Sequence, residues 1–206
     1  MRKTRTYHIA ITGSFASGKS TVAEFFKNKG YTIVSADQIG HSLLEQDRVK
    51  ELLVREFGTD ILSNKKIERK KLAMRVFSDK KALKTLNDLL HPKIINELKR
   101  IVKESNEEIV LFEVPLLFEV GIESLFDLTV NIEATPVKRK QRLLKKGYLT
   151  DKEIDERFAS QLREDFKREK ADLTIDNNGS IKELYLQLEV ISQIISKKLL
   201  INSTTN

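Results

Sequence analysis

The sequence predicts an α/β fold built on a parallel sheet of five strands, with helices on both faces of the sheet. Five short segments rich in Ile, Val, Leu and Thr are interpreted as strands: 7–12, 31–35, 109–114, 128–132 and 172–176. Their apolar residues run almost without interruption, which is typical of strands buried on both faces of a parallel sheet. Helical stretches separate them, as connections between parallel strands require.

The chain begins with the basic stretch MRKTR, directly before the first expected strand. A positive start is also found in signal peptides, but here the apolar part is at most six residues long and includes His8. No apolar run approaches the about 18 residues that a membrane-spanning helix needs. Cysteine is absent, which excludes disulfides and thiolate metal sites. We therefore expect a cytoplasmic protein without a membrane partner.

Between the first strand and the following helix lies a glycine-rich loop, GSFASGKST, which matches the pattern G-x-x-x-x-G-K-[ST] in full. The glycines allow the backbone N–H groups to turn inward around an anion, and the helix start adds partial positive charge. Lys19 is placed to reach the β- and γ-phosphates, and the Ser20 hydroxyl to bind Mg²⁺. The loop predicts a nucleoside triphosphate site with the contacts Gly13, Ser14, Phe15, Ala16, Ser17, Gly18, Lys19, Ser20 and Thr21.

Asp37 follows the second expected strand, in VSADQIGH. Ligands of open α/β sheets gather at the carboxyl ends of the strands, so this carboxylate is a candidate to accept or orient the proton of an attacking hydroxyl. The same residue type is also a common N-cap, here for a helix starting near Gln38. The spacing leaves both interpretations open.

More than seventy residues, about 37–108, separate the second strand from the third, far more than one crossover helix requires. The stretch predicts three or four helices, with boundaries at Gly58, at Ser78-Asp79 and at His91-Pro92. We expect this insertion to be a substrate-binding subdomain. His91 alone is more typical of a helix boundary than of a catalytic group.

Glu113 ends the third expected strand, in IVLFE. A carboxylate at this position is suited to hold Mg²⁺ directly or through water, as in the second phosphate-site motif of nucleotide-binding proteins. The alternative is that Glu113 only ends the strand. Glu119, a little further on, is interpreted as a surface or structural residue.

A basic run from Lys138 to Lys170 follows the fourth expected strand and predicts two helices joined by the loop 147–150. Positions spaced by three or four residues share a helix face, and such a hairpin is able to close over a triphosphate and exclude water. The alternative is a solvated charged face. The residues that share these faces are Arg139, Arg142, Lys146, Arg157 and Gln161.

Taken together, these segments resemble the dephospho-coenzyme A kinase family. The matching pieces are TGSFASGKST, SADQIGH, LLHPKI, EVPLLFEVGIESLFD, ERFASQL and ADLTIDNNGS, in the order and spacing of the family. They extend from about Ile9 to Gly179, nearly the whole chain. EVPLLFE with a downstream LFD is far more specific than the phosphate loop.

The resemblance implies transfer of the ATP γ-phosphoryl group to the ribose 3′-hydroxyl of dephospho-coenzyme A, with Mg²⁺. It also implies a three-layer α/β/α P-loop fold in a single kinase domain, 1–206. Its expected parts are a nucleotide-binding core at about 1–37, 107–137 and 164–200, a helical coenzyme-binding insertion at about 38–106, and a lid at about 138–163.

The resemblance also implies roles for particular residues. Lys19, Asp37 and Arg142 become catalytic candidates, with Asp37 as the base or hydroxyl-orienting group. Contacts to ATP are implied for Arg142, Arg157 and Asn177, the last near adenine. Contacts to the acceptor or metal are implied for Asp37, His91, Glu113, Gln161 and Ser20.

The chain departs from the family at several of these places. Ser14 and Phe15-Ala16 stand where members often have glycine and smaller residues. Arg139 and Lys146 stand where many members have glutamine and arginine, and Glu113 replaces an aspartate. Lysine supplies charge without the bidentate geometry of arginine.

Two other functions remain as alternatives at the level of sequence. One is a kinase for another small acceptor, such as a nucleoside monophosphate. The other is a nucleotide switch or nucleic-acid-binding protein that uses the net charge of +7. The chain lacks the interleaved aromatic and basic residues that stack bases, so we expect no nucleic-acid partner. The sequence does not determine the oligomeric state.

Overall fold

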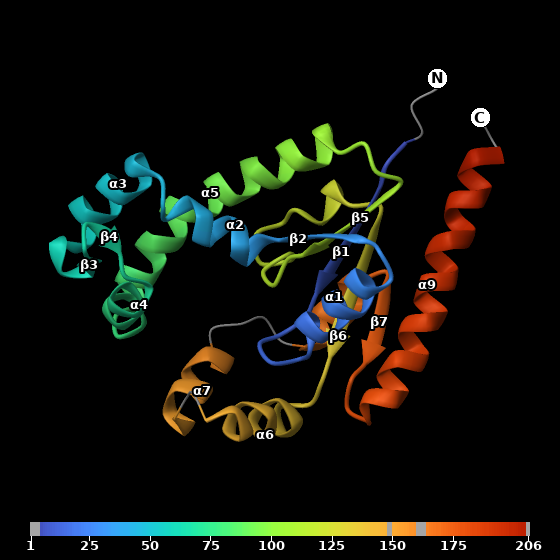
Figure 1. Cartoon of the computed structure of the whole chain (residues 1–206). Helices are drawn as coiled ribbons and strands as arrows, with labels where there is room; N and C mark the ends of the chain where they lie inside the picture. Colours follow the sequence, from blue (N-terminus) through green and yellow to red (C-terminus); the bar gives the residue numbers. More distant parts are fainter. Residues whose placement is uncertain (1–4, 148–149, 160–163, 205–206) are drawn as a thin grey trace. The chain divides into compact units, whose positions relative to one another are not determined.

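The computed structural model describes residues 5–147, 150–159 and 164–204 (Figure 1). The chain divides into two compact units, one formed by Met1–Val34 with Glu104–Asn206 and the other by Ser35–Lys103. The first unit contains the strands and helices β1 (Tyr7–Thr12), α1 (Lys19–Asn28), β2 (Thr32–Ser35), β5 (Ile109–Glu113), η2 (Glu123–Leu125), β6 (Leu128–Glu133), α6 (Pro136–Lys146), α7 (Asp151–Ala159), α8 (Glu164–Lys170), β7 (Leu173–Asp176) and α9 (Ile181–Thr204).

The five predicted strands form one sheet in the order β2-β5-β1-β6-β7, with β1 at its centre. β1 pairs in parallel with β5 and β6, and β6 pairs in parallel with β7. Every residue of β1 is buried, which explains its continuous apolar sequence. The predicted α/β fold with a five-stranded parallel sheet is therefore confirmed.

Alternate residues of these strands face two different layers. On one face, Ile9 and Ile11 of β1 join a core that includes Val22 and Phe26 of α1 and Leu188 of α9. On the other face, Glu133 of β6 pairs with Arg168 of α8. Because side chains alternate along a strand, the sheet lies between the α1 and α9 layer and the α8 layer.

Capping residues set the ends of several helices. The Thr135 hydroxyl accepts from the backbone N–H of Lys138, and Pro136 begins α6. Thr150 and Glu153 form a reciprocal capping box at the start of α7. These hydrogen bonds lower the pKa of the Glu153 carboxyl.

The second unit contains α2 (Ala36–Leu43), α3 (Asp47–Phe57), η1 (Thr59–Ile61), β3 (Leu62–Ser63), β4 (Lys66–Ile67), α4 (Arg69–Phe77) and α5 (Lys80–Glu104). Its helices pack around the apolar residues Val49, Leu53, Phe57, Ile61, Leu72, Val76 and Ala82. The prediction of three or four helices in this stretch is confirmed. The small antiparallel hairpin of β3 and β4 is an addition that the sequence analysis did not predict.

The predicted helix boundary at His91-Pro92 is wrong. Pro92 lies inside α5, which continues for 25 residues. Proline removes one backbone hydrogen bond, and this cost is offset because the apolar stripe of Leu86, Leu89 and Leu90 already packs on the core of the unit. Tertiary packing therefore outweighs the local signal of the dipeptide.

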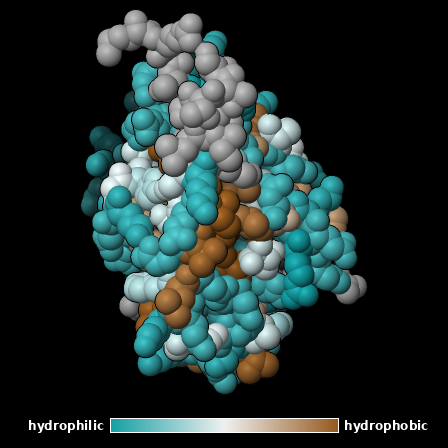
Figure 2. Space-filling view, turned by 90° about the vertical axis from the view of Figure 1, so that its right-hand side faces the viewer, coloured by the Kyte–Doolittle hydropathy of each residue, from teal (hydrophilic) through white to brown (hydrophobic). Residues whose placement is uncertain are grey.

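α9 presents apolar side chains to solvent on one side. Figure 2 views the side on which α9 lies and shows a brown stripe there. The exposed apolar residues of this helix are Ile181, Tyr185, Leu186 and Val190.

In the described part of the chain, no helix combines the length and the apolar character needed to cross a membrane.

Candidate active site

The phosphate loop joins β1 to α1 and is held tightly against the sheet. Gly13 has a φ of +142°, and a Cβ atom there would lie 2.3 Å from the backbone oxygen of Ile132 in β6. Gly18 adopts a left-handed conformation as the N-cap of α1. The hydroxyl oxygens of Ser14 and Ser17 are buried without a hydrogen-bond partner among the described residues. Such a loop has the backbone form and the spare polar groups for an anion.

Lys19 begins α1 and lies against the loop. Its ammonium group donates hydrogen bonds to the backbone oxygens of Gly13, at 2.8 Å, and Ser14, at 3.0 Å. The side chain is buried, so the positive charge is screened little by solvent. Ser20 and Thr21 follow in the first turn of the same helix, with Ser20 exposed. The predicted loop residues and Lys19 therefore lie together, and their role in binding stays a prediction.

Arginines of α6 reach the same loop. The Arg142 guanidinium donates to the backbone oxygens of Ser17, at 3.1 Å, and Ala16, at 3.4 Å, and also to that of Asn177. Burial lowers the pKa of Arg142, but a guanidinium stays charged at neutral pH. The structure thus brings Arg142 beside the loop, as the helix-face prediction requires.

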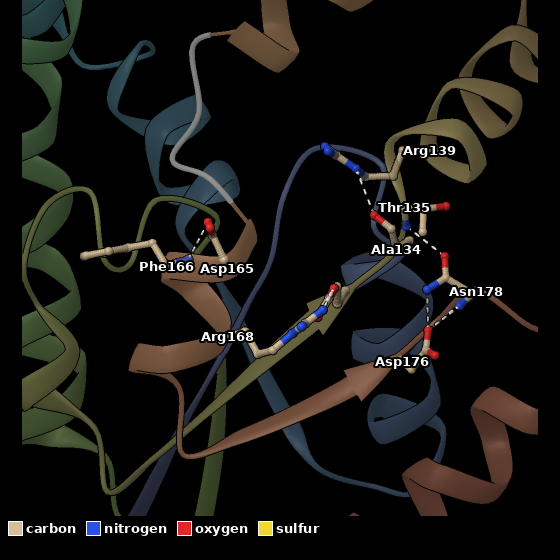
Figure 3. Close-up of polar contacts among 9 residues, drawn as sticks. Ala134, Thr135, Arg139, Asp165, Phe166, Arg168, Asp176 and Asn178 are labelled. Atoms are coloured by element: carbon tan, nitrogen blue, oxygen red, sulfur yellow. Dashed lines mark hydrogen bonds and ion pairs between the residues drawn. The ribbon is translucent and has the colours of Figure 1, made fainter.

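Arg139 connects three segments of this site. It is 5% exposed, and its guanidinium donates to the backbone oxygens of Ala134, at 3.1 Å, and Phe15, at 3.3 Å. Figure 3 shows Arg139 extending from α6 back to Ala134 at the end of β6. The guanidinium also lies 4.3 Å from the centre of the Phe158 ring of α7. Arg157, next to Phe158, lies over the ring of Phe15.

Asn177 follows β7 and supports the loop from the side. Its side-chain amide donates to the backbone oxygen of Ser17 at 2.7 Å, and its backbone N–H donates to the backbone oxygen of Glu133 at 2.8 Å. The next residue, Asn178, accepts from the backbone N–H of Thr135, as Figure 3 shows. Asn177 therefore holds the turn after β7 against the phosphate loop. Its predicted position near adenine stays a prediction.

Glu113 is the last residue of β5 and is half-buried. It pairs in register with Ile11, two residues before Gly13, and side chains in register point to the same face of a parallel sheet. That face carries α1, where Ser20 lies in the first turn. Among the described residues, no cluster of three or more His, Cys, Asp or Glu is arranged to hold a metal. A hydroxyl and one carboxylate fit Mg²⁺ that takes its remaining ligands from phosphates and water.

Glu119 is not a surface residue. Its carboxylate lies 2.7 Å from the ammonium of Lys167. The Lys167 side chain has no exposed area. Lys167 also donates to the backbone oxygen of Pro115 at 3.3 Å. This buried ion pair connects α8 with the segment after β5, so the structural alternative for Glu119 is confirmed.

Asp37 belongs to the second unit, where it lies exposed in the first turn of α2. Ser35 is the N-cap of this helix, and its hydroxyl accepts from the backbone N–H of Gln38 at 3.4 Å. The interpretation of Asp37 as the cap is therefore wrong. His41 lies one turn further along, and its Nδ1 atom accepts a hydrogen bond from Arg69 at 3.0 Å.

Three other predicted residues are His91, which the structure describes, and Gln161 and Lys146, which it does not describe in full. His91 is half-buried in α5, and burial lowers its pKa while the nearby Asp88 carboxylate opposes the shift. Gln161 lies outside the described residues, as does the side chain of Lys146. The roles of all three in binding stay predictions.

Several site contacts were not predicted from the sequence: the stacking of Arg139 on Phe158, the contact of Arg157 with Phe15, and the buried Lys167. The aromatic residue inside the phosphate loop was a signal for the second of these. A buried lysine in a run of charged residues has no such signal, because charge runs are usually solvated.

Comparison with known proteins gives a consistent assignment. A family model described as dephospho-CoA kinase matches residues 7–183. A dephospho-CoA kinase of Lactobacillus johnsonii is 39% identical over 93% of this chain and 100% of the relative. One of Helicobacter pylori is 38% identical over 88% of this chain and 93% of its own.

Solved structures agree with this assignment. A protein of Thermus thermophilus, 30% identical, has a TM-score of 0.76 and covers 92% of this chain and 97% of its own. A dephospho-CoA kinase from Campylobacter jejuni, 29% identical, has a TM-score of 0.64 and covers 94% and 99% of the two chains. A shikimate kinase from Acinetobacter baumannii, at 15% identity and a TM-score of 0.51, shares only the fold. The match to the family model and the identity with these relatives show that the chain belongs to the dephospho-CoA kinase family.

Proposed function

We propose that the chain transfers the γ-phosphoryl group of ATP to the ribose 3′-hydroxyl of dephospho-coenzyme A through the residues described above. The products are coenzyme A and ADP, the last step of coenzyme A biosynthesis. The observation that carries the proposal is the convergence of Lys19 and Arg142 on one phosphate loop. Transition states of phosphoryl transfer are stabilised mainly by positioning and by neutralised charge, which these two cations supply.

On the nucleotide side, the inward N–H groups of the loop bind the phosphate oxygens, and Lys19 moves from the loop carbonyls to the β- and γ-phosphates. Arg142 and Arg157 neutralise charge that develops on the transferring group. α6 and α7, which we name the lid, exclude water from it. The hydrogen bonds of Arg142 to the backbone oxygens of Ala16 and Ser17 in the loop support this role.

On the acceptor side, Asp37 orients the 3′-hydroxyl toward the γ-phosphorus and accepts its proton. An exposed carboxylate that caps no helix is available for this task. His91 and Gln161 contribute contacts to the acceptor. Burial keeps His91 neutral near pH 7, so its ring is able to accept as well as donate a hydrogen bond.

Ser20 and Glu113 would hold Mg²⁺, with Glu113 bound directly or through water. When bound, the ion neutralises phosphate charge and orients the triphosphate. We further propose a cytoplasmic location and no nucleic-acid or membrane partner, in line with the small phosphorylated substrates of this reaction.

The replacement Asp37→Asn tests the acceptor side. It preserves the shape of the side chain but replaces one acceptor oxygen with an NH2 donor, and it removes the charge and the capacity to take a proton. We expect kcat to fall by about 10²–10⁴-fold, the usual contribution of a general base, while KM for ATP changes little. Steady-state kinetics with both substrates varied separately measure this.

Asp47→Asn is the matched control, because Asp47 also lies exposed in the first turn of a helix, α3, where it pairs with Lys50. The control variant should keep wild-type kcat. An unchanged kcat in Asp37→Asn would remove Asp37 from the mechanism.

A further inference from the structure

Phe15 is an aromatic residue within the phosphate loop, and anion binding does not explain it. Phosphate loops bind phosphates through backbone N–H groups, so the x positions of the motif need no large side chain. The Phe15 ring is half-buried, and the next residue, Ala16, has a φ of +62°. The positive φ belongs to Ala16, so the large side chain at position 15 is explained neither by the turn of the backbone nor by anion binding.

The ring of Phe15 contacts α7. The Arg157 guanidinium carbon lies 5.2 Å from the ring centre, a separation typical of a cation–π contact. The negative face of an aromatic ring attracts a cation that lies over it. Arg157 is thereby held next to the loop that surrounds the phosphates.

A second set of contacts joins Phe15 to both lid helices. Its backbone oxygen accepts from Arg139 of α6, and Arg139 stacks on Phe158 of α7. Phe158 adjoins Arg157 in α7. The phosphate loop is therefore connected to α6 through the Phe15 backbone and to α7 through the Phe15 ring, and α6 and α7 are connected to each other. Arg142, in contrast, is held by the backbone oxygens of Ala16, Ser17 and Asn177.

We infer that Phe15 is a positioning residue that holds Arg157 beside the phosphate loop for phosphoryl transfer. The inference rests on the proposed function, in which Arg157 neutralises charge on the triphosphate. Phe15 acts through its ring and through Arg157, and it acts independently of Arg142. It follows that an aromatic ring at position 15 of this chain contributes to kcat/KM beyond what apolar bulk alone contributes.

A double-mutant cycle of Phe15→Leu and Arg157→Gln tests this in the full chain. Leucine keeps apolar bulk but has no π face. We expect Phe15→Leu to lower kcat/KM for ATP by roughly two- to fivefold, the range of an exposed cation–π contact. In the Arg157→Gln background the same replacement should have no further effect, since the partner is gone. Phe15→Tyr, which keeps the ring, should restore wild-type kcat/KM.

Phe25→Leu and Lys29→Gln form the matched control cycle. Lys29, the C-cap of α1, lies over the Phe25 ring at the same 5.2 Å and outside the proposed machinery. This pair should show no coupling in kcat/KM, whatever it costs in thermal stability. A loss that is additive with Arg157→Gln, or a Phe15→Tyr variant as impaired as Phe15→Leu, would overturn the inference.

Failure of the proposed function can be distinguished from failure of the inference about Phe15. If dephospho-coenzyme A fails to stimulate the wild-type chain, the acceptor assignment fails, and the Phe15 cycle is then measured through the Kd for ATP. Coupling between Phe15 and Arg157 in that Kd would support the inference, and additivity would overturn it.

Discussion

At the scale of single residues, the site depends on glycines whose backbone no other residue adopts without strain. Gly13 combines a positive φ with a close approach to the Ile132 carbonyl of β6. Gly30, after α1, also has a positive φ, but a Cβ atom there would meet nothing within 4 Å. The two positions separate the cost of the backbone conformation from the cost of the steric clash.

The replacement Gly13→Ala should destabilise the fold by about 2–5 kcal/mol, because left-handed strain and overpacking add. Gly30→Ala should cost only about 1–2 kcal/mol, from left-handed strain alone. Urea unfolding of the two variants measures the difference. Equal losses of stability would show that the contact with β6 does not constrain the loop.

At the scale of elements, those with strong local signals were predictable from the sequence. The five strands are continuous apolar runs, and the loop with α1 carries a complete motif, so their type and order could be inferred. The hairpin β3–β4 was not predictable, because its turn residues Asn64 and Lys65 take positive φ without the glycine that usually marks such turns. α5 continues through Pro92 for reasons of packing, which the local sequence does not contain.

In the site, too, features with a local sequence signal were predictable and features set by tertiary contacts were not. Motif and helix periodicity were sufficient to bring Lys19 and Arg142 to one loop. Partners set by tertiary contacts were not predictable: the burial of Lys167 against Glu119 and the place of Asn177 under the loop depend on segments far apart in sequence. Spacing alone also could not decide whether Asp37 caps α2 or is left available for a substrate, and the structure has Ser35 as the cap.

At the scale of the whole molecule, the net charge of +7 is distributed unevenly. Residues 35–103 hold 16 Lys and Arg against 10 Asp and Glu, a net charge of +6. The other unit holds 21 against 20. The excess positive charge lies on the unit that we propose binds the acceptor, whose phosphates are anionic. A basic sequence therefore does not require a nucleic-acid partner here.

Each unit also contains a histidine with a lowered pKa, which makes stability depend on pH. For His8 the main cause is burial, with Asp127 opposing it and Arg5 adding to it, and for His91 it is burial, with Asp88 opposing it. A lowered pKa means that the unfolded chain binds protons first as the pH falls. The stabilisation is complete above the unfolded pKa of about 6.5 and is lost as the pH falls from there toward the folded pKa.

We therefore expect the urea midpoint to be constant above about pH 7.5 and to fall between about pH 6.5 and 5.5, before the carboxylates titrate. His8→Gln should reduce this fall, because glutamine keeps a polar side chain that does not bind a proton in this pH range. A midpoint that rises on acidification over the same interval would contradict the assignment of buried, neutral histidines.

The most direct test of the central claim is ADP production from ATP and Mg²⁺ with dephospho-coenzyme A, measured beside AMP, CMP, adenosine and no acceptor. The account predicts that dephospho-coenzyme A alone among these stimulates turnover well above the rate without acceptor. Preferential stimulation by AMP or CMP would contradict it, leaving the phosphate loop as a nucleotide site but removing the acceptor role proposed for Asp37 and the insertion.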